Sequence, residues 1–288
     1  MKRTPQDWAV DIVAYSLAVL MILVTAVPLM NVLSKAFSSE TALVANQITA
    51  YPIGFQLATM KYVLQSDLFL RSFGNSIFVT LLGSALNLAV TLLAAYPLSK
   101  RTLLFQKPLL ILFVFTMWFN GGMIPTYLVI KQFKMVNSFL ALILPGAIGV
   151  YNLLIVKNYF ESLPDALEES ARVDGAGIFT TFFRVVLPLS KPVIATILLF
   201  VAVSFWNDYF SPMIYITRTN LKTLPVYLRD MIVESQTDVT RSALDDQNLI
   251  PEGIRSATIV ASTLPILIVY PFLQKHFVKG VLIGAVKG

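Results

Sequence analysis

The sequence offers few residues whose types and spacing could carry out covalent chemistry. Cysteine is absent and histidine occurs once, at His276. This excludes thiolate catalysis, disulfides and Cys-based metal sites, and it makes a histidine-built metal centre or catalytic triad implausible. Neither a GxxxxGK[ST] phosphate-binding loop nor an HExxH zinc-protease motif is present. We therefore expect no catalytic residue, no metal and no cofactor, and the chain is predicted not to be an enzyme.

The acidic residues that could do chemistry of another kind gather in one polar segment, residues 160–191. Asp165, Glu168, Glu169 and Asp174 lie there within ten positions. Carboxylates of this kind accept charge-assisted hydrogen bonds from a partner. Because Ala171 and Gly175 in the same stretch are small, a partner could approach the backbone closely. The chemistry that this pattern favours is recognition by shape and charge, not catalysis.

The same segment is predicted to form a helix, a turn and a second short helix. Pro164 suits the first helical turn, and the acids that follow it favour the positive end of the helix dipole. Gly175 and Gly177 are expected to end the first helix. A second helix follows, and its apolar residues recur at i, i+3 and i+4 spacing: Ile178, Phe179, Phe182, Phe183 and Val186. Pro188 is expected to end it. Amphipathicity alone would favour a segment that rests on the lipid surface.

The composition indicates that residues 160–191 are held by membrane-spanning helices. Of the 288 residues, 56% are hydrophobic and 13% are charged, whereas soluble domains average about 45–50% and about 25%. The mean hydropathy is +0.73. These values exclude an ordinary soluble enzyme, a disordered protein and a typical nucleic-acid binder. The chain is predicted to be an all-α, polytopic membrane protein.

Six segments are long and apolar enough to cross a bilayer, which takes about 20 residues at a rise of about 1.5 Å each. They are residues 12–33, 72–96, 108–130, 139–159, 192–216 and 257–277. The first is too long for a signal-peptide core, and no small-x-small cleavage site follows it, so we interpret it as a retained helix. No internal repeat or separate soluble domain is evident, and residues 1–288 are predicted to form a single domain.

The distribution of Lys and Arg predicts the orientation. Loop 97–107 contains Lys100, Arg101 and Lys107 without an acid, and such loops remain cytoplasmic. The net charge of +6 and the tail with Lys275, Lys279 and Lys287 agree with two cytoplasmic termini. Lys131 and Lys134 on the opposite side make the bias modest. Segment 160–191 then lies inside, and the polar segments 34–71 and 217–256 lie outside.

Polar residues inside the spans are candidates for function because burial in hydrocarbon is costly. Asn87 lies near the middle of its span, where it either faces a translocation path or bonds a neighbouring helix. Asp208 lies about 24 Å along its helix from Pro192, near the outer interface, so a proton-relay role is weak. The run Asn120-Gly121-Gly122, with Pro125 just beyond it, predicts a break in the third span.

The polar inner segment resembles a family signature. Glu169-Ser170-Ala171, then Gly175 after three residues, then Val185-Val186-Leu187-Pro188 after nine more, is similar to the EAA–G–LP signature of ATP-binding-cassette (ABC) importer permeases. Ser170 replaces the first Ala and Val185 replaces the usual Ile, and both are small or apolar. The resemblance implies that residues 160–191 form the coupling helix between spans 4 and 5, which docks on an ATPase subunit.

Further matches extend over nearly the whole chain and resemble the maltose-type carbohydrate permeases. They are Asn75-Ser76, Ala95-Tyr96-Pro97-Leu98-Ser99, Trp206-Asn207-Asp208-Tyr209 and the tail from Phe277 to Gly288. The stretch Asn120–Tyr127, together with Leu142–Pro145, is closer to a branch that handles oligosaccharides, including uronate-containing ones.

The resemblance implies a role and a set of partners. The chain would be a permease subunit that moves carbohydrate, of the oligosaccharide class and including uronate-containing ones, across the bacterial cytoplasmic membrane by alternating access. Its partners would be a second permease in a heterodimer, two cytoplasmic ATPase subunits that bind the ATP, and an extracytoplasmic solute-binding protein. Segment 217–256 would contact that binding protein. No nucleic-acid partner is expected.

Two sets of site residues are expected, the first implied by the resemblance and the second chosen from polar and aromatic residues of the spans. The residues expected to dock on the ATPase are Leu167, Glu168, Glu169, Ala171, Asp174, Gly175, Phe179, Leu187 and Pro188. The residues expected along the substrate path are Asn87, Trp118, Asn120, Trp206, Asn207 and Asp208. Aromatic residues at the interface could stack on sugar rings, but belts of Trp and Tyr are equally ordinary there.

Two other classes of protein compete with this interpretation. One is an ion-driven secondary transporter or channel, in which residues 160–191 form only a lid. Such proteins often have paired repeats and carboxylates at the bilayer midplane, and neither is evident here. The other is an intramembrane enzyme, for which the sequence lacks a credible catalytic set.

Overall fold

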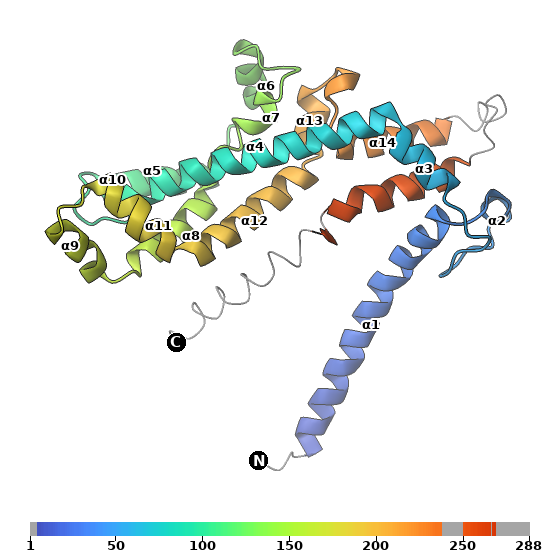
Figure 1. Cartoon of the computed structure of the whole chain (residues 1–288), viewed down its shortest axis with the longest axis horizontal. Helices are drawn as coiled ribbons and strands as arrows, with labels where there is room; N and C mark the ends of the chain where they lie inside the picture. Colours follow the sequence, from blue (N-terminus) through green and yellow to red (C-terminus); the bar gives the residue numbers. More distant parts are fainter. Residues whose placement is uncertain (1–4, 238–249, 266, 269–288) are drawn as a thin grey trace. The chain divides into compact units, whose positions relative to one another are not determined.

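The structure is a computed structural model that describes residues 5–237, 250–265 and 267–268 (Figure 1). Every regular element in these ranges is a helix, so the all-α prediction is confirmed for the part of the chain that is described. The tail from Phe277, with His276 and the tail lysines, and the central part of segment 217–256 lie outside these ranges.

The chain divides into two compact units. In the first, helices α1 (Pro5–Ala36), α2 (Glu40–Val44) and α3 (Ala58–Gln65) precede a helix over residues 251–265. Asn31 of α1 donates hydrogen bonds to the carbonyl oxygens of Ile48 and Thr49. Lys35 pairs with Glu252 at 3.0 Å between Nζ and Oε1. The first contacts tie the segment after α1 to α1, and the ion pair ties α1 to the helix over residues 251–265.

The second unit contains Arg71–Val226 and both candidate sites. Its helices are α4 (Asp67–Leu98), which begins four residues earlier, α5 (Gln106–Trp118), α6 (Met123–Gln132), α7 (Leu140–Ile143), α8 (Val150–Glu161), α9 (Asp165–Val173), α10 (Ile178–Thr181), a π-helical turn (Phe182–Val186), α11 (Leu187–Leu189), α12 (Lys191–Asn207), α13 (Phe210–Tyr215) and the start of α14 (Leu224–Thr237).

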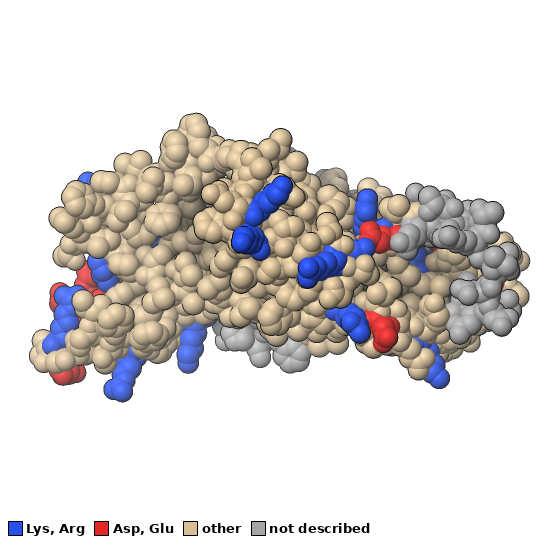
Figure 2. Space-filling view, turned by 90° about the horizontal axis from the view of Figure 1, so that it is seen from above, with Lys and Arg blue, Asp and Glu red and all other residues tan. Residues whose placement is uncertain are grey.

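Two of the described helices are long and apolar enough to cross a membrane alone, Val10–Ala36 and Asp67–Leu98. They contain the predicted spans 12–33 and 72–96. Two helix pairs satisfy the same criteria only when taken together, α5 with α6, bent by 111°, and 178–189 with α12, bent by 80°. The surface agrees with a lipid environment, since most of the face in Figure 2 is formed by residues other than Lys, Arg, Asp and Glu.

Several predicted spans are interrupted. The predicted break at Asn120-Gly121-Gly122 is confirmed: α5 ends at Trp118, α6 begins at Met123, and Gly122 has a φ of 84°. Span 139–159 was expected to be continuous, but it consists of α7 and α8. The interruption contains Pro145 and Gly146, and proline lacks the N–H that a continuing helix requires. Likewise, span 192–216 is divided at Asp208 and Tyr209.

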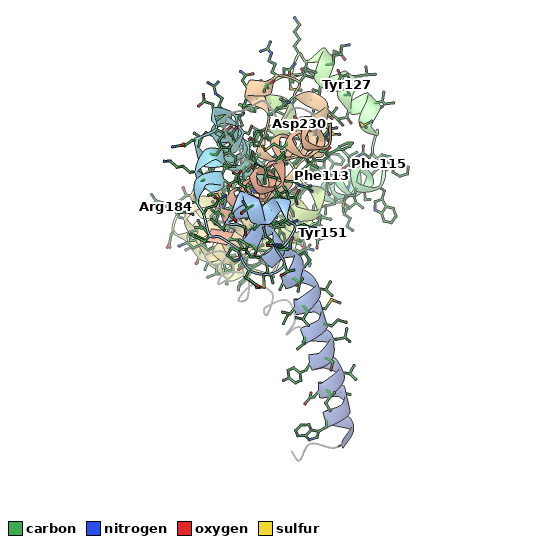
Figure 3. The ribbon with its side chains drawn as sticks, turned by 90° about the vertical axis from the view of Figure 1, so that its right-hand side faces the viewer. Phe113, Phe115, Tyr127, Tyr151, Arg184 and Asp230 are labelled. Atoms are coloured by element: carbon green, nitrogen blue, oxygen red, sulfur yellow. The ribbon has the colours of Figure 1, made fainter. Side chains whose placement is uncertain are left out.

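Two clusters of buried apolar residues hold the second unit together. One joins the end of α4, α8, the π turn and α12, with Phe160, Phe182 and Ile197 almost fully buried. The other joins α4, α6, α7 and α13. On α5, Phe113 packs against the first cluster whereas Phe115 is exposed on the outer side of the helix (Figure 3). α5 therefore presents an apolar face to lipid or to a partner.

Candidate functional site

The first candidate site is the inner segment, in which α9 has well-defined ends. Pro164 immediately precedes α9 as its N-cap, one position earlier than predicted. At the other end, the Gly175 N–H donates to the Arg172 carbonyl, and the Ala176 N–H donates to the Ala171 carbonyl. This is the Schellman pattern of a helix C-terminus, with Gly175 at a φ of 81° in the left-handed region.

The two glycines of this turn have different roles. Gly177 was expected to help end α9, but its φ is −72° and it is the N-cap of α10. An alanine there would need no unusual backbone conformation. Only Gly175 has a conformation that other residues rarely adopt. The first helix therefore ends because of one glycine.

The second helix of the segment differs from its predicted pattern. Its apolar residues do not share one face: Phe182 and Val186 are buried in the core, whereas Ile178, Phe179 and Phe183 are exposed. Residues 182–186 form a π-helical turn, which changes the direction of the following side chains. Pro188 does not end the helix. It lies in α11, and the chain bends beyond Leu189.

The exposed apolar residues next to the turn form what we call the inner patch, namely Val173, Ile178 and Phe179. Their exposed fractions are 88%, 69% and 74%. Large apolar side chains that gather on a surface commonly mark a protein–protein or membrane contact. Charged side chains of both signs gather at the same end of the unit, which contains α9 and α10 (Figure 2).

Most residues expected to dock on the ATPase lie at this surface. Glu169, Asp174, Gly175, Phe179 and Pro188 are exposed. Leu167 is exposed as well, and Ala171 and Leu187 are partly buried.

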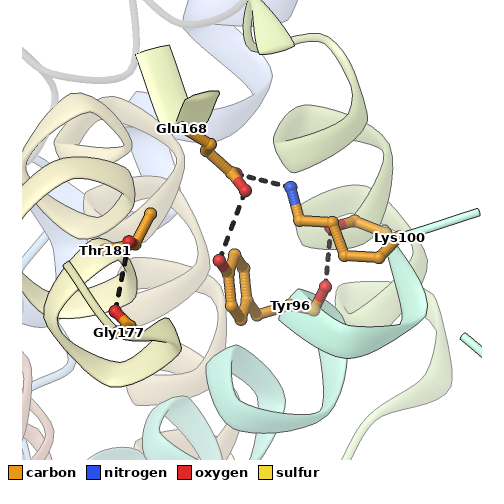
Figure 4. Close-up of polar contacts among 6 residues, drawn as sticks. Tyr96, Lys100, Glu168, Gly177 and Thr181 are labelled. Atoms are coloured by element: carbon orange, nitrogen blue, oxygen red, sulfur yellow. Dashed lines mark hydrogen bonds and ion pairs between the residues drawn. The ribbon is translucent and has the colours of Figure 1, made fainter. Parts of the chain in front are cut away.

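Glu168 is the exception and corrects the prediction. Only 8% of the residue is exposed, and its carboxylate accepts from Lys100 and Tyr96 instead of facing outward (Figure 4). The reason is electrostatic, because Lys100 at the end of α4 provides a cation on the inner side of α9.

The second candidate site is a cavity of about 780 Å³ between α4, the α7–α8 break and the α12–α13 break. Asn87 of α4 donates a hydrogen bond of 2.7 Å to the Gly146 carbonyl and accepts one from the Thr91 hydroxyl. The expected bond from Asn87 to a neighbouring segment is therefore present, and Asn87 also lines the cavity. The helix breaks bring backbone groups of Pro145, Gly146 and Gly149 to the same wall.

Three of the six predicted path residues line this cavity: Asn87, Asn207 and Asp208. The others do not. Trp118 is 82% exposed at the end of α5, and Asn120 accepts a hydrogen bond from the Gly122 N–H within the break. Trp206 packs edge-on against Phe73 at 6.0 Å between ring centroids. Trp206 and Asn207 are neighbours on α12, and only Asn207 belongs to the lining.

Several polar residues of the wall were not predicted, among them Thr126, Asn152, Ser204, Ser211 and Tyr215. All five lie inside predicted spans, so the rule that selected Asn87 would have selected them too. Together with Asp208, whose carboxylate accepts from the Ser211 N–H at 3.1 Å, they provide hydrogen-bonding groups over an otherwise apolar wall. Such a surface suits a ligand with many hydroxyl groups.

Phe205 separates this cavity from the packing behind it. A Cβ atom at Gly83 of α4 would lie 2.7 Å from the Phe205 ring, and one at Gly146 would lie 3.1 Å from it. Two glycines therefore accept the ring between α4 and the α7–α8 break.

The Asn75-Ser76 pair joins α4 to the segment before α14. Asn75 donates to the carbonyl oxygens of Asn220 and Lys222 at 3.0 and 2.9 Å. The Ser76 hydroxyl accepts from the Leu224 N–H at 2.8 Å. These contacts hold residues 220–224 beside α4, which is the described beginning of the segment expected to contact a binding protein.

Comparison with known proteins gives a consistent picture. Residues 102–283 match the model of the family described as binding-protein-dependent transport system inner membrane component. The protein LplC of Bacillus subtilis is 47% identical over 92% of this chain and 90% of its own length. The polygalacturonan/rhamnogalacturonan transport system permease protein YtcP of the same organism is 41% identical over 96% and 98%.

A solved structure is similar over the whole length. It is the crystal structure of a bacterial ABC transporter involved in the import of the acidic polysaccharide alginate. The matched chain is 33% identical with a TM-score of 0.89, and the match covers 96% of this chain and 99% of that one.

Proposed function

The chain belongs to the family of binding-protein-dependent transport system inner membrane components, and from this premise we propose how it functions. It is the permease subunit of an ABC importer for carbohydrate. Relatives similar over nearly their whole length include a permease for polygalacturonan and rhamnogalacturonan and a chain of an alginate importer. The cargo is an oligosaccharide, and we propose that it contains uronate.

The coupling role is assigned to residues 160–191. The single observation that carries this assignment is the inner patch, in which Val173, Ile178 and Phe179 are exposed beside the left-handed Gly175. Its position within the EAA–G–LP spacing supports contact with an ATPase subunit. ATP would be bound and hydrolysed by that partner, not by this chain.

The remaining parts of the assembly follow from this role. A second permease would complete a heterodimer, and a solute-binding protein would deliver the sugar on the outer side. Six spans with both termini cytoplasmic would place residues 160–191 inside. Taking each bent helix pair as one span gives up to four spans among the described residues, and we propose α7 with α8 as a further interrupted span.

The cavity is proposed as this chain's part of the translocation path. Asn87, Asn207 and Asp208 are assigned to it, and Asn152 and Ser204 are added. Amide and hydroxyl groups exchange hydrogen bonds with sugar hydroxyls as readily as with water, which supports passage of a hydrated solute.

Substitution of Gly175 tests the coupling assignment. Gly175→Asp adds bulk and charge to the surface expected to contact the ATPase, so the ATPase subunit should no longer co-purify with the permease. Gly175→Asn is the matched control, because Asn has the same shape, no charge and a similar tolerance of left-handed backbone. Equal retention of the ATPase by wild type and Gly175→Asp, with normal uptake, would contradict docking at this turn.

A further inference from the structure

We propose that Glu168, Lys100 and Tyr96 form a clasp that fastens the coupling segment to α4, so that the two move as one body during transport. The inference rests on the proposed function, because it assumes that the segment is displaced by an ATPase. In this proposal Glu168 transmits the displacement within the chain and does not contact the ATPase. Within this chain the clasp makes α4 the element that carries the displacement to the cavity.

The contacts of the clasp join residues far apart in the sequence. Lys100 Nζ lies 2.5 Å from Glu168 Oε1, and the Tyr96 hydroxyl donates to Glu168 Oε2 at 3.3 Å. Lys100 Nζ also lies 5.1 Å from the centre of the Tyr96 ring, within the range of a cation–π interaction. Both carboxylate oxygens of Glu168 therefore have partners at the end of α4 or just after it (Figure 4).

The clasp is set into the apolar core. The Tyr96 ring lies 4.8 Å from that of Phe182 and 6.2 Å from that of Phe160. The Glu168 side chain is 10% exposed and that of Lys100 is 25% exposed. Removing one partner of such a pair leaves a poorly solvated charge. The pair thus resists separation of α9 from α4.

The orientation of Glu168 argues against a docking role. Its neighbours Leu167 and Glu169 are exposed, whereas Glu168 is buried against α4. On a helix, adjacent residues point in directions about 100° apart. α9 therefore has one side available to a partner and another side, with Glu168, fastened to this chain.

The course of α4 explains how displacement at the clasp would reach the cavity. α4 is one continuous helix from Asp67 to Leu98, unlike the interrupted spans beside it. Asn87, on the cavity wall, precedes Tyr96 by nine residues, or about 13 Å along the axis. Because Asn87 is bonded to Gly146, a shift of α4 would also move the α7–α8 break that lines the cavity.

The first test is Glu168→Gln in the complete transporter reconstituted with its ATPase and binding protein. The variant should retain the ATPase subunit and basal ATP hydrolysis, while uptake per ATP hydrolysed should fall about tenfold, a typical size for coupling between sites. Glu252→Gln is the control. It removes the 3.0 Å pair with Lys35, which lies outside the coupling segment, so it should couple normally.

The exchanged pair Lys100→Glu with Glu168→Lys should recover uptake if the two residues act by pairing. A sharper test uses the absence of native cysteines. In the Lys100→Cys/Glu168→Cys variant, uptake should be low while the thiols are free and should rise when a short bifunctional thiol reagent joins them. This rise distinguishes a mechanical link from a requirement for folding alone.

Several results would overturn the clasp. They are normal coupling in Glu168→Gln, loss of the ATPase subunit from that variant, or uptake that stops on cross-linking and returns on release. The last would mean that α9 and α4 must separate. Absence of ATP-driven uptake in the wild-type transporter would instead refute the proposed function, so the two failures are distinguishable.

Discussion

At the scale of single residues, Asp208 combines a carboxylate on the cavity wall with a hydrogen bond to the first turn of α13, whose N-cap is Tyr209. Its carboxylate accepts from the Ser211 N–H. Asp208→Asn keeps an acceptor and removes the charge, so ATP coupling should remain intact and uptake should weaken at most severalfold. Asp208→Ala also removes the hydrogen bond from the Ser211 N–H and should lower stability by about 1 kcal/mol.

Uptake, ATPase activity and thermal unfolding of the purified transporter would measure these effects. Uncoupling of ATP hydrolysis from transport by Asp208→Asn would show that the position of this residue near the outer mouth has been misinterpreted.

Asn87 is expected to matter for both structure and passage. Asn87→Leu removes the partner of the Gly146 carbonyl and of the Thr91 hydroxyl. A buried group left without a partner costs about 1–3 kcal/mol, so the melting temperature and uptake should both fall. Asn87→Gln, which keeps the amide, should be milder in the same two measurements. An Asn87→Leu transporter with normal stability and uptake would exclude Asn87 from the path.

Residue types could be predicted more readily than directions of side chains. The rule that polar residues within spans are candidates for function selected Asn87 and Asp208, and both line the cavity. It says nothing of which side of a helix a residue faces. Trp206, expected in the path as an aromatic residue that could stack on a sugar ring, packs on Phe73. The direction of the Glu168 side chain could not be predicted either, because its partner Lys100 lies 68 positions away in the sequence.

At the scale of elements, the approach of α4 to α12 depends on Gly83. Gly83→Ala would place a Cβ 2.7 Å from the Phe205 ring, and such overpacking costs about 1–3 kcal/mol. Gly74→Ala is the control on the same helix, since a Cβ there meets nothing within 4 Å. It should be neutral or stabilising by up to about 1 kcal/mol.

Thermal unfolding of the two purified variants would compare them directly. If Gly83→Ala were as stable as Gly74→Ala, α4 and α12 would have to be able to separate without cost, contrary to the packing around Phe205.

The inner patch predicts a second effect on α10. Phe179 is exposed, so Phe179→Ser should leave the stability of the permease nearly unchanged. It should nevertheless weaken capture of the ATPase subunit at least about tenfold, because aromatic anchors dominate many interfaces. Titrating the ATPase against the permease in nanodiscs would measure this, with exposed Thr180→Ala as the control. Equal affinities for the two variants would remove Phe179 from the interface.

The ends of helices were predictable where glycines and capping residues mark them in the sequence. The break at Asn120-Gly121-Gly122 and the end of α9 at Gly175 follow from glycine and capping geometry. The interruption at Pro145 and Gly146 was missed, because its flanks are apolar enough for an unbroken span. The π turn at residues 182–186 has no comparable sequence signal. It depends on how Phe182 and Val186 enter the core.

At the scale of the whole molecule, hydropathy predicted an all-helical membrane protein, and the motif spacing predicted its family. The family is confirmed by the match over residues 102–283. The number of spans stays a prediction, because among the described residues only Val10–Ala36 and Asp67–Leu98 are long and apolar enough by themselves. A test that requires one continuous apolar helix does not detect an interrupted span. Whether the two parts of such a span cross the membrane together depends on tertiary packing.

The most direct test is uptake of labelled galacturonate oligosaccharide into proteoliposomes that contain this chain, its partner permease and the ATPase. Uptake should require ATP on the ATPase side and binding protein on the other, and it should be insensitive to ionophores that collapse ion gradients. Uptake that proceeds on an imposed ion gradient without ATP would contradict the importer assignment and favour an ion-driven transporter.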